Sequence, residues 1–149
     1  MPIAQMTQSG RVLAPADLDE LERRLAVRLP VDYRDFLLRH NGGRPKPAAF
    51  PLVDGDESRL DLLYGVSDDE QRDVAEQTAW LEGDHILPDT IAVGVDAGGN
   101  HLCLGVAAHN LGKVYFVDHE ELEGDTLDER AIELAGSWTE FEASIGQRE

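Results

Sequence analysis

The sequence predicts one domain of the α+β class, and three observations lead to this prediction. A chain of 149 residues suits a single domain with a substantial core. Apolar residues follow helical spacing over residues 15–43 and again over 127–145, whereas those of 91–117 alternate with a period of two. Helices and antiparallel strands that occupy separate stretches of a chain are typical of an α+β fold.

The first helix is expected over residues 15–27. Pro15 suits the first turn of a helix, and Leu18, Leu21 and Leu25 follow at helical spacing with charged residues on the opposite side. Because the connection to the next helix is short, we expect the two helices to be neighbours, with the leucines facing the second one.

The stretch LPVDYRDFLLRHNGG, residues 29–43, carries the most consistent local signals in the chain. It has a proline that suits the start of a helix, three large apolar side chains on one helical face, and an Asn-Gly-Gly end that tolerates positive φ. We therefore expect a short buried helix with a structural role. The residues of this motif are Pro30, Tyr33, Phe36, Leu37, Asn41, Gly42 and Gly43.

The middle of the chain predicts two strands and a third helix. A proline-rich passage leads into a brief edge strand near residues 50–53, and an apolar run over 60–64 predicts a second strand. A helix is expected from Asp69 to Leu81, because carboxylates at its start suit the helix dipole. Val74, Thr78 and Leu81 mark its inner side, with Ala75 and Trp80 nearby.

The strongest β pattern predicts a three-stranded antiparallel meander. Its strands are expected over residues 91–95, 102–106 and 114–117, separated by clusters of turn-forming residues. A closing helix is expected over residues 127–145. The second face of the meander carries small or polar residues, so we expect it to be solvated or closely covered by another backbone. These residues are Ala92, Gly94, His101, Cys103 and Gly105.

The N-terminal residues predict a flexible lead over 1–11, followed by the domain over 12–149. No signal peptide is expected, because the lead has neither a basic nor a long apolar segment. No apolar run approaches the roughly 20 residues of a membrane-spanning helix. Cys103 is the one cysteine and so cannot form an intrachain disulfide, which fits a reducing compartment. We therefore expect a cytoplasmic protein.

The charge of the chain is unevenly distributed. Residues 1–46 hold eight Lys/Arg and six Asp/Glu, a net of +2, whereas the remaining residues hold five and 24, a net of −19. Such a surface repels nucleic acid and anionic lipid and attracts basic partners, so neither nucleic acid nor membrane is an expected partner. The alternative, that acidity only maintains solubility, stays open.

The motifs of familiar enzyme classes are incomplete in this chain. Gly94–Gly99 has the glycine spacing of a phosphate-binding loop, but Asn100 and His101 replace the required Lys-Ser/Thr and a strand follows, so a hairpin turn is expected. No HExxH or GxSxG pattern occurs, and Cys103 sits mid-strand without a basic activator. We expect no enzyme, no catalytic residues and no cofactor.

Two chemical alternatives to this expectation concern the acidic residues near the end of the meander. Asp118, His119, Glu120 and Glu121 could bind a divalent ion through oxygen and nitrogen, but a solvated acidic loop explains them as well, so no metal site is expected. An enzyme that uses Asp96, Asp118 and His119 is the second alternative, and it lacks a complete catalytic constellation.

The acidic remainder supplies candidate partner-binding residues. An acidic surface can bind a partner whose own site is lined with cations, and long-range attraction speeds the capture of that partner. A tight complex also needs aromatic anchors, for which Trp80 and Tyr115 are possible although a core position is the default for both. The candidate residues are Asp96, Asp118, Glu120, Glu121, Glu123, Asp125, Asp128 and Glu129.

Two segments resemble the SUKH superfamily, in the branch similar to fungal cell-wall-synthesis regulators. LPVDYRDFLLRHNGG, preceded by a leucine helix, resembles the family signature, and residues 91–120 resemble its hairpin region. The closing helix with Trp138 and Phe141 is similar to the C-terminal helix of the family, whereas residues 47–88 match loosely. The matching residues of the hairpin region are Asp96, Gly98, Asn100, Gly112, Val114, Tyr115, Phe116, Asp118 and His119.

The resemblance implies a SUKH-like domain with a central antiparallel sheet flanked by helices. It also implies a non-enzymatic protein-binding domain, because bacterial members are widely regarded as immunity proteins that neutralise a toxin, often a nuclease or deaminase. A housekeeping regulatory or scaffolding domain without a toxin partner is the alternative. The family has no catalytic residue set that could be transferred, and the sequence predicts no oligomeric state.

Overall fold

A computed structural model gives the fold of the chain and describes residues 5–52, 55–81, 86–120 and 130–146. Its helices are α1 (Pro15–Leu25), α2 (Val31–Arg39), the 3₁₀ turn η2 (Glu70–Arg72), α3 (Val74–Trp80) and α5 (Trp138–Ser144). Its strands are β1 (Gln5–Thr7), β2 (Arg44–Lys46), β3 (Ala49–Pro51), β4 (Glu57–Leu63), β5 (Thr90–Asp96), β6 (His101–Gly105), β7 (Val114–Val117) and β8 (Ala131–Ala135).

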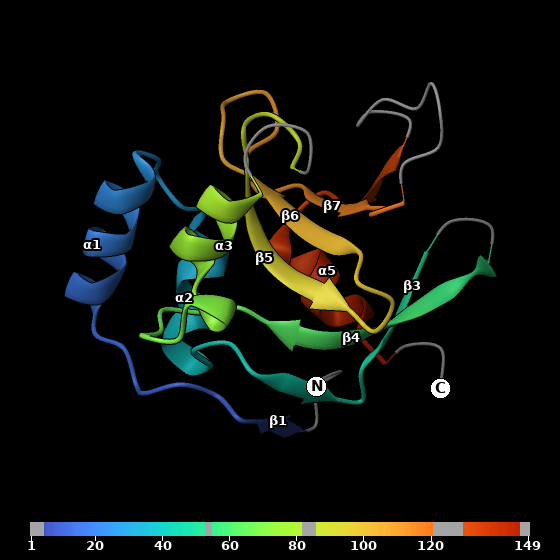
Figure 1. Cartoon of the computed structure of the whole chain (residues 1–149), viewed down its shortest axis with the longest axis horizontal. Helices are drawn as coiled ribbons and strands as arrows, with labels where there is room; N and C mark the ends of the chain where they lie inside the picture. Colours follow the sequence, from blue (N-terminus) through green and yellow to red (C-terminus); the bar gives the residue numbers. More distant parts are fainter. Residues whose placement is uncertain (1–4, 53–54, 82–85, 121–129, 147–149) are drawn as a thin grey trace.

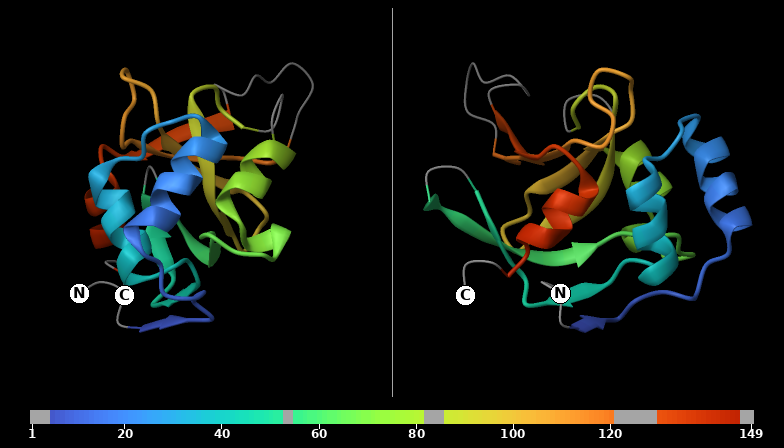
Figure 2. Two further views of the ribbon diagram at one scale, coloured as in Figure 1. Left: turned by 90° about the vertical axis from the view of Figure 1, so that its left-hand side faces the viewer. Right: turned by 180° about the vertical axis from the view of Figure 1, so that it is seen from behind.

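A six-stranded sheet with the order β3-β4-β5-β6-β7-β8 forms the centre, and every neighbouring pair is antiparallel. Figure 1 shows α3 beside β5 and α1 outside α3. Seen from behind in Figure 2, α2 and α5 cover the same face of the sheet. The expected α+β domain with a central antiparallel sheet flanked by helices is confirmed, as is the β5–β6–β7 meander.

The second face of the meander, which carries small residues, is closely covered by another backbone. Of the two alternatives expected for it, a solvated or a covered face, the covered one is found. Cys103 is fully buried. A Cβ atom added to Gly105 would lie 2.0 Å from the carbonyl oxygen of Asn110, so only glycine lets that loop approach. This close approach explains the small residues of the face.

The third helix is interrupted where one continuous helix was expected over 69–81. Asp73 has extended backbone angles (φ −99°, ψ 127°) and separates η2 from α3. Its buried carboxylate accepts hydrogen bonds from the amides of Ser67 (3.0 Å) and Glu76 (3.0 Å). Asp73 therefore acts as the N-cap of α3, and a cap residue lies outside the helical geometry.

The closing helix expected over 127–145 is wrong in its first half. Residues 131–135 form β8, which pairs with β7 and covers an edge of the sheet. α5 begins only after Ser137, whose hydroxyl oxygen accepts a hydrogen bond from the amide of Glu140 at 3.1 Å. Pairing with β7 thus overrides the helical spacing, while residues 121–129 lie outside the described part of the chain.

The N-terminal segment differs from the flexible lead expected over residues 1–11. Residues 5–7 form β1, which pairs antiparallel with β2. Further along, the Ser9 hydroxyl donates to the carbonyl oxygen of Gly42 at 2.9 Å. The boundary of the domain at residue 12 stays a prediction.

Aromatic side chains join α2 to α5 beneath the sheet. The ring of Trp138 lies 4.9 Å from that of Tyr33 and 5.0 Å from that of Phe36, measured between centroids. An ion pair joins the same two helices: the Arg39 guanidinium of α2 makes two hydrogen bonds of 2.9 Å to the carboxylate of Glu142 in α5. Tyr33 and Phe36 are fully buried, and these contacts hold α2 against α5.

Asn41 does more than end the second helix, because its buried side chain joins three separate segments. Its Nδ2 donates to the carbonyl oxygens of Arg11 (3.1 Å) and Val66 (2.9 Å), and its Oδ1 accepts from the Val66 amide (2.7 Å). Its carbonyl oxygen accepts from the Gly10 amide at 2.9 Å. We call this set of contacts the Asn41 junction. A Cβ atom at Gly65 would lie 2.1 Å from Asn41 Oδ1, so the junction also requires glycine there.

Replacing Asn41 by alanine should lower the free energy of unfolding by about 1–3 kcal/mol, because it leaves the partly buried amide and carbonyl of Val66 without their protein partner. Urea unfolding monitored by circular dichroism measures the change. Val12→Ala is the control, since Val12 is 88% exposed and should change stability by less than about 0.5 kcal/mol. Equal stabilities of the two variants would contradict the role of the junction.

Candidate functional site

Asp96, a candidate partner-binding residue, lies buried in the turn between β5 and β6. Its Oδ1 accepts hydrogen bonds from the amides of Gly98 (2.9 Å) and Asn100 (2.8 Å). Its Oδ2 accepts from the Ser58 hydroxyl (2.7 Å) and from Asn100 Nδ2 (3.1 Å). Asp96 is 4% exposed, so it shapes the turn and presents no charge for a partner to contact.

The hydrogen bonds keep the Asp96 carboxyl ionised. Burial alone would raise the pKa of Asp96, but the bonds from Ser58, Asn100 and Gly98 outweigh it and hold the pKa below its usual value. A carboxylate whose two oxygens already accept four hydrogen bonds is a poor general base.

Asn100 connects this turn to the end of β7. Its Oδ1 accepts from the His119 amide at 3.0 Å and lies 2.6 Å from His119 Nδ1. Asp118 and Glu120 flank this histidine, and all three residues are exposed. The other candidate residues, Glu121, Glu123, Asp125, Asp128 and Glu129, lie outside the described part of the chain.

These contacts bring Asp96, Asn100 and His119 together without forming a catalytic set. Asp96 and His119 are linked through an amide side chain, which transfers no proton between them. Burial raises the pKa of the Cys103 thiol to about 12, so the reactive thiolate is not available at neutral pH. Among the described residues, no group of three or more His, Cys, Asp or Glu side chains is placed to hold a metal ion.

A different surface, on η2 and α3, presents an aromatic side chain to solvent. Trp80 is 81% exposed, so the default core position is wrong for it, whereas Tyr115 is half-buried. Within α3 the buried residues are Val74 and Ala75. Trp80 follows Glu76 and Gln77 by four and three residues and therefore lies on their side of the helix.

A surface hollow of about 400 Å³ lies against this tryptophan, and we call it the Trp80 hollow. Gln77 Nε2 donates to the carbonyl oxygen of Glu70 at 3.0 Å, which ties α3 to η2 across it. The described residues that line the Trp80 hollow are Glu70, Gln71, Glu76, Gln77 and Trp80. One aromatic ring and two carboxylates thus share a small concave surface.

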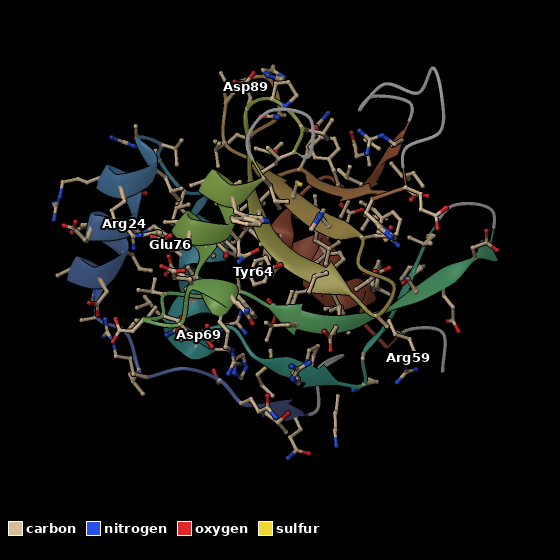
Figure 3. The ribbon with its side chains drawn as sticks, in the orientation of Figure 1. Arg24, Arg59, Tyr64, Asp69, Glu76 and Asp89 are labelled. Atoms are coloured by element: carbon tan, nitrogen blue, oxygen red, sulfur yellow. The ribbon has the colours of Figure 1, made fainter. Side chains whose placement is uncertain are left out.

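Ion pairs fix this surface to α1. Arg24 Nη2 lies 3.2 Å from Glu76 Oε1 and 3.5 Å from Asp73 Oδ2. In Figure 3 Arg24 and Glu76 lie next to each other between α1 and α3. The Asp73 side chain is only 1% exposed, so Arg24 compensates a buried charge.

A second hollow, of about 420 Å³, lies beside the first. The two hollows share Gln71 as a lining residue. Tyr64 and Asp69, both labelled in Figure 3, line the second hollow together with Val95 of β5. The two hollows together are lined by residues of η2, α3 and the central strands β4 and β5.

The sequence reasoning missed the η2–α3 surface because it attended to the acidic stretch after residue 117. One signal was available: Val74, Thr78 and Leu81 mark one side of the helix, and Trp80 lies off that side. No helix in the described ranges is long and apolar enough to cross a membrane.

Comparison with known proteins relates the chain to a family. A sequence profile of the SMI1 / KNR4 family (SUKH-1) matches residues 13–144. One relative is the SPbeta prophage-derived uncharacterized protein YokK of Bacillus subtilis (strain 168), which is 26% identical over 146 residues. The alignment covers 86% of this chain and 72% of YokK.

Asp96→Asn should lower the free energy of unfolding at pH 7 by about 1–3 kcal/mol, because its amide NH₂ would face donors that now meet a carboxylate. Since the folded-state pKa of Asp96 is below 3.8, this stabilisation is complete above pH 3.8 and is lost as the pH falls through the lower value. Wild type and Asp96→Asn should therefore differ in their free energies of unfolding at pH 7, and this difference should disappear below about pH 3.

The control for this experiment is Asp118→Asn, which removes the same charge from an exposed side chain. Its effect at pH 7 should stay within about 0.5 kcal/mol. A constant difference between wild type and Asp96→Asn across the acid range would contradict the assignment to the ionised carboxylate.

Proposed function

Because this chain belongs to the SMI1/KNR4 family (SUKH-1), we propose that it is a non-enzymatic protein-binding domain of the immunity type, which neutralises a cognate bacterial toxin. The family match over residues 13–144 is the observation that carries this proposal. It spans α1 to α5 and therefore the whole sheet and both helices behind it. Bacterial members of the superfamily are widely regarded as immunity proteins.

The chemistry of the described residues supports a binding role over a catalytic one. Asp96 is saturated with hydrogen bonds, and Cys103 is buried with a raised pKa. The residues most exposed around the concave surface are instead of the kind that form interfaces, an aromatic side chain surrounded by polar groups.

The net charge of −17 supports a basic partner. A toxin that acts on nucleic acid holds phosphate with Lys and Arg side chains, and an acidic protein attracts that surface over several ångströms. Long-range attraction raises the association rate, which favours an inhibitor that must act before the toxin does. The same charge disfavours nucleic acid and anionic membrane as partners.

A cytoplasmic location agrees with this role. A toxin that reaches the cytoplasm or is made there is neutralised where its substrate lies. The chain holds one cysteine, Cys103, which is buried and free, so no disulfide ties the protein to an oxidising compartment.

Co-expression with the toxin encoded beside its gene should restore growth to cells that the toxin alone arrests, because the complex blocks the toxin. Colony counts with and without induction measure the rescue. The control is Trp138→Asp, which places a charge at a buried position of the core and should therefore unfold the domain and abolish rescue. Absence of rescue would count against the immunity function, and an isolated gene with no toxin neighbour would favour a regulatory domain instead.

The affinity for that toxin should fall about tenfold or more between 50 mM and 500 mM salt, because salt screens the attraction between the acidic chain and a basic partner. Isothermal calorimetry at both salt concentrations measures the dissociation constants. An affinity that is independent of salt would exclude a charge-led complex while leaving the growth rescue to be explained by apolar contacts.

A further inference from the structure

We propose that the Trp80 hollow receives an arginine or lysine side chain of the protein partner. This inference rests on the proposed function, because it names the surface and the chemistry by which a partner would be recognised. Three features of the described residues carry it: an exposed aromatic ring, carboxylates beside that ring, and a rigid frame that holds both.

The exposed ring is not needed to hold α3 in place. Val74 of α3 and Leu81 directly after it are buried, so the helix is already anchored on its other side. A tryptophan that is 81% exposed leaves a large apolar and π-electron surface in water. Tryptophan is enriched at the centres of protein interfaces because it contributes much contact area from few rotatable bonds.

The carboxylates beside the ring select a cation. The face of an indole ring attracts a guanidinium or ammonium group, and Glu70 and Glu76 line the same hollow. Within the described part of the chain, Glu70 makes no ion pair, whereas Glu76 shares Arg24 with Asp73. Glu70 is therefore the carboxylate with an unused charge.

The wider surface around the hollow is also negative. The two hollows and the Arg24 ion pairs hold five carboxylates against three guanidinium groups, a net charge of −2. These charged residues are Arg24, Arg44, Asp61, Asp69, Glu70, Arg72, Asp73 and Glu76. A phosphate or an acidic peptide would be repelled, so the charge favours a basic segment of a protein.

The frame of the hollow is held in place before a partner binds. Asp69 Oδ1 accepts from the Gln71 amide at 3.0 Å and Asp73 Oδ2 accepts from the Glu76 amide at 3.0 Å, which caps η2 and α3. Gln77 joins the two elements through its bond to Glu70. Because these groups need not be ordered on binding, less of the interaction energy is lost to entropy.

The experiment is a titration of the ¹⁵N-labelled full chain with a hexa-arginine peptide at low salt, followed by nuclear magnetic resonance. The chain has two indole N–H groups, those of Trp80 and the buried Trp138, so the two signals are readily separated. We expect the Trp80 indole signal and the amides of residues 70–80 to shift. Trp80→Ala should weaken binding about fivefold, whereas Trp80→Tyr should retain most of it.

A matched pair of variants separates contact from general acidity. Glu70→Gln and Glu120→Gln each remove one charge from an exposed side chain, but only Glu70 lines the hollow. Glu70→Gln should weaken peptide binding about threefold more than Glu120→Gln does. Equal effects of the two variants, or shifts centred on residues 118–120, would overturn the proposal, as would no binding at all.

Growth rescue distinguishes this proposal from the function it rests on. If wild type rescues growth and Trp80→Ala rescues it equally well at limiting expression, the Trp80 hollow is not the recognition surface, although the immunity function stands. If wild type fails to rescue, the immunity function fails, and the peptide titration still decides whether the hollow binds a cation. The midpoint of thermal unfolding of Trp80→Ala should match that of wild type. If Trp80→Ala is destabilised, the binding and rescue measurements are made with Trp80→Tyr and Glu70→Gln instead.

Discussion

The buried amide of Asn41 is the constraint on which the arrangement of this molecule depends. One side chain satisfies backbone groups of the N-terminal segment and of the loop after β4, which are 30 and 25 residues away along the chain. The segment between β1 and α1 and the segment between β4 and η2 are thus both held to the end of α2. In a buried site each unmade bond would cost about 1–3 kcal/mol, so the junction fixes one geometry over its alternatives.

Asp73 continues this constraint toward the surface. Its carboxylate caps α3, holds the Ser67 amide and draws Arg24 of α1 into an ion pair. The loop that Asn41 anchors at Val66 is therefore anchored again seven residues later. Between them, the two side chains set where Glu70 and Trp80 stand relative to the sheet. A surface defined in this way can be complementary to a partner without rearranging, which suits fast capture of a toxin.

The sequence predicted the elements whose signals are local and missed those that depend on distant partners. The α2 motif and the meander follow from spacing and turn residues, and both are as expected. The role of Asn41 was limited to ending a helix, because nothing near it in the sequence points to Arg11 or Val66. Residues 131–135 have helical spacing but pair with β7. The true start of the helix had a local signal, because Ser137 and Glu140 have the spacing of a capping box. Trp80 was assigned by residue type to the core, and only its position relative to Leu81 argued otherwise.

We propose that the partner binds a preformed acidic surface on η2 and α3, and not an enclosed cavity. Hydrogen exchange of the chain, free and in complex with its toxin, tests this claim most directly. Contact at this surface should slow exchange of the amides of residues 70–80, with little change in α5 behind the sheet. Slowed exchange confined to α5 and β8, with residues 70–80 unaffected, would contradict it.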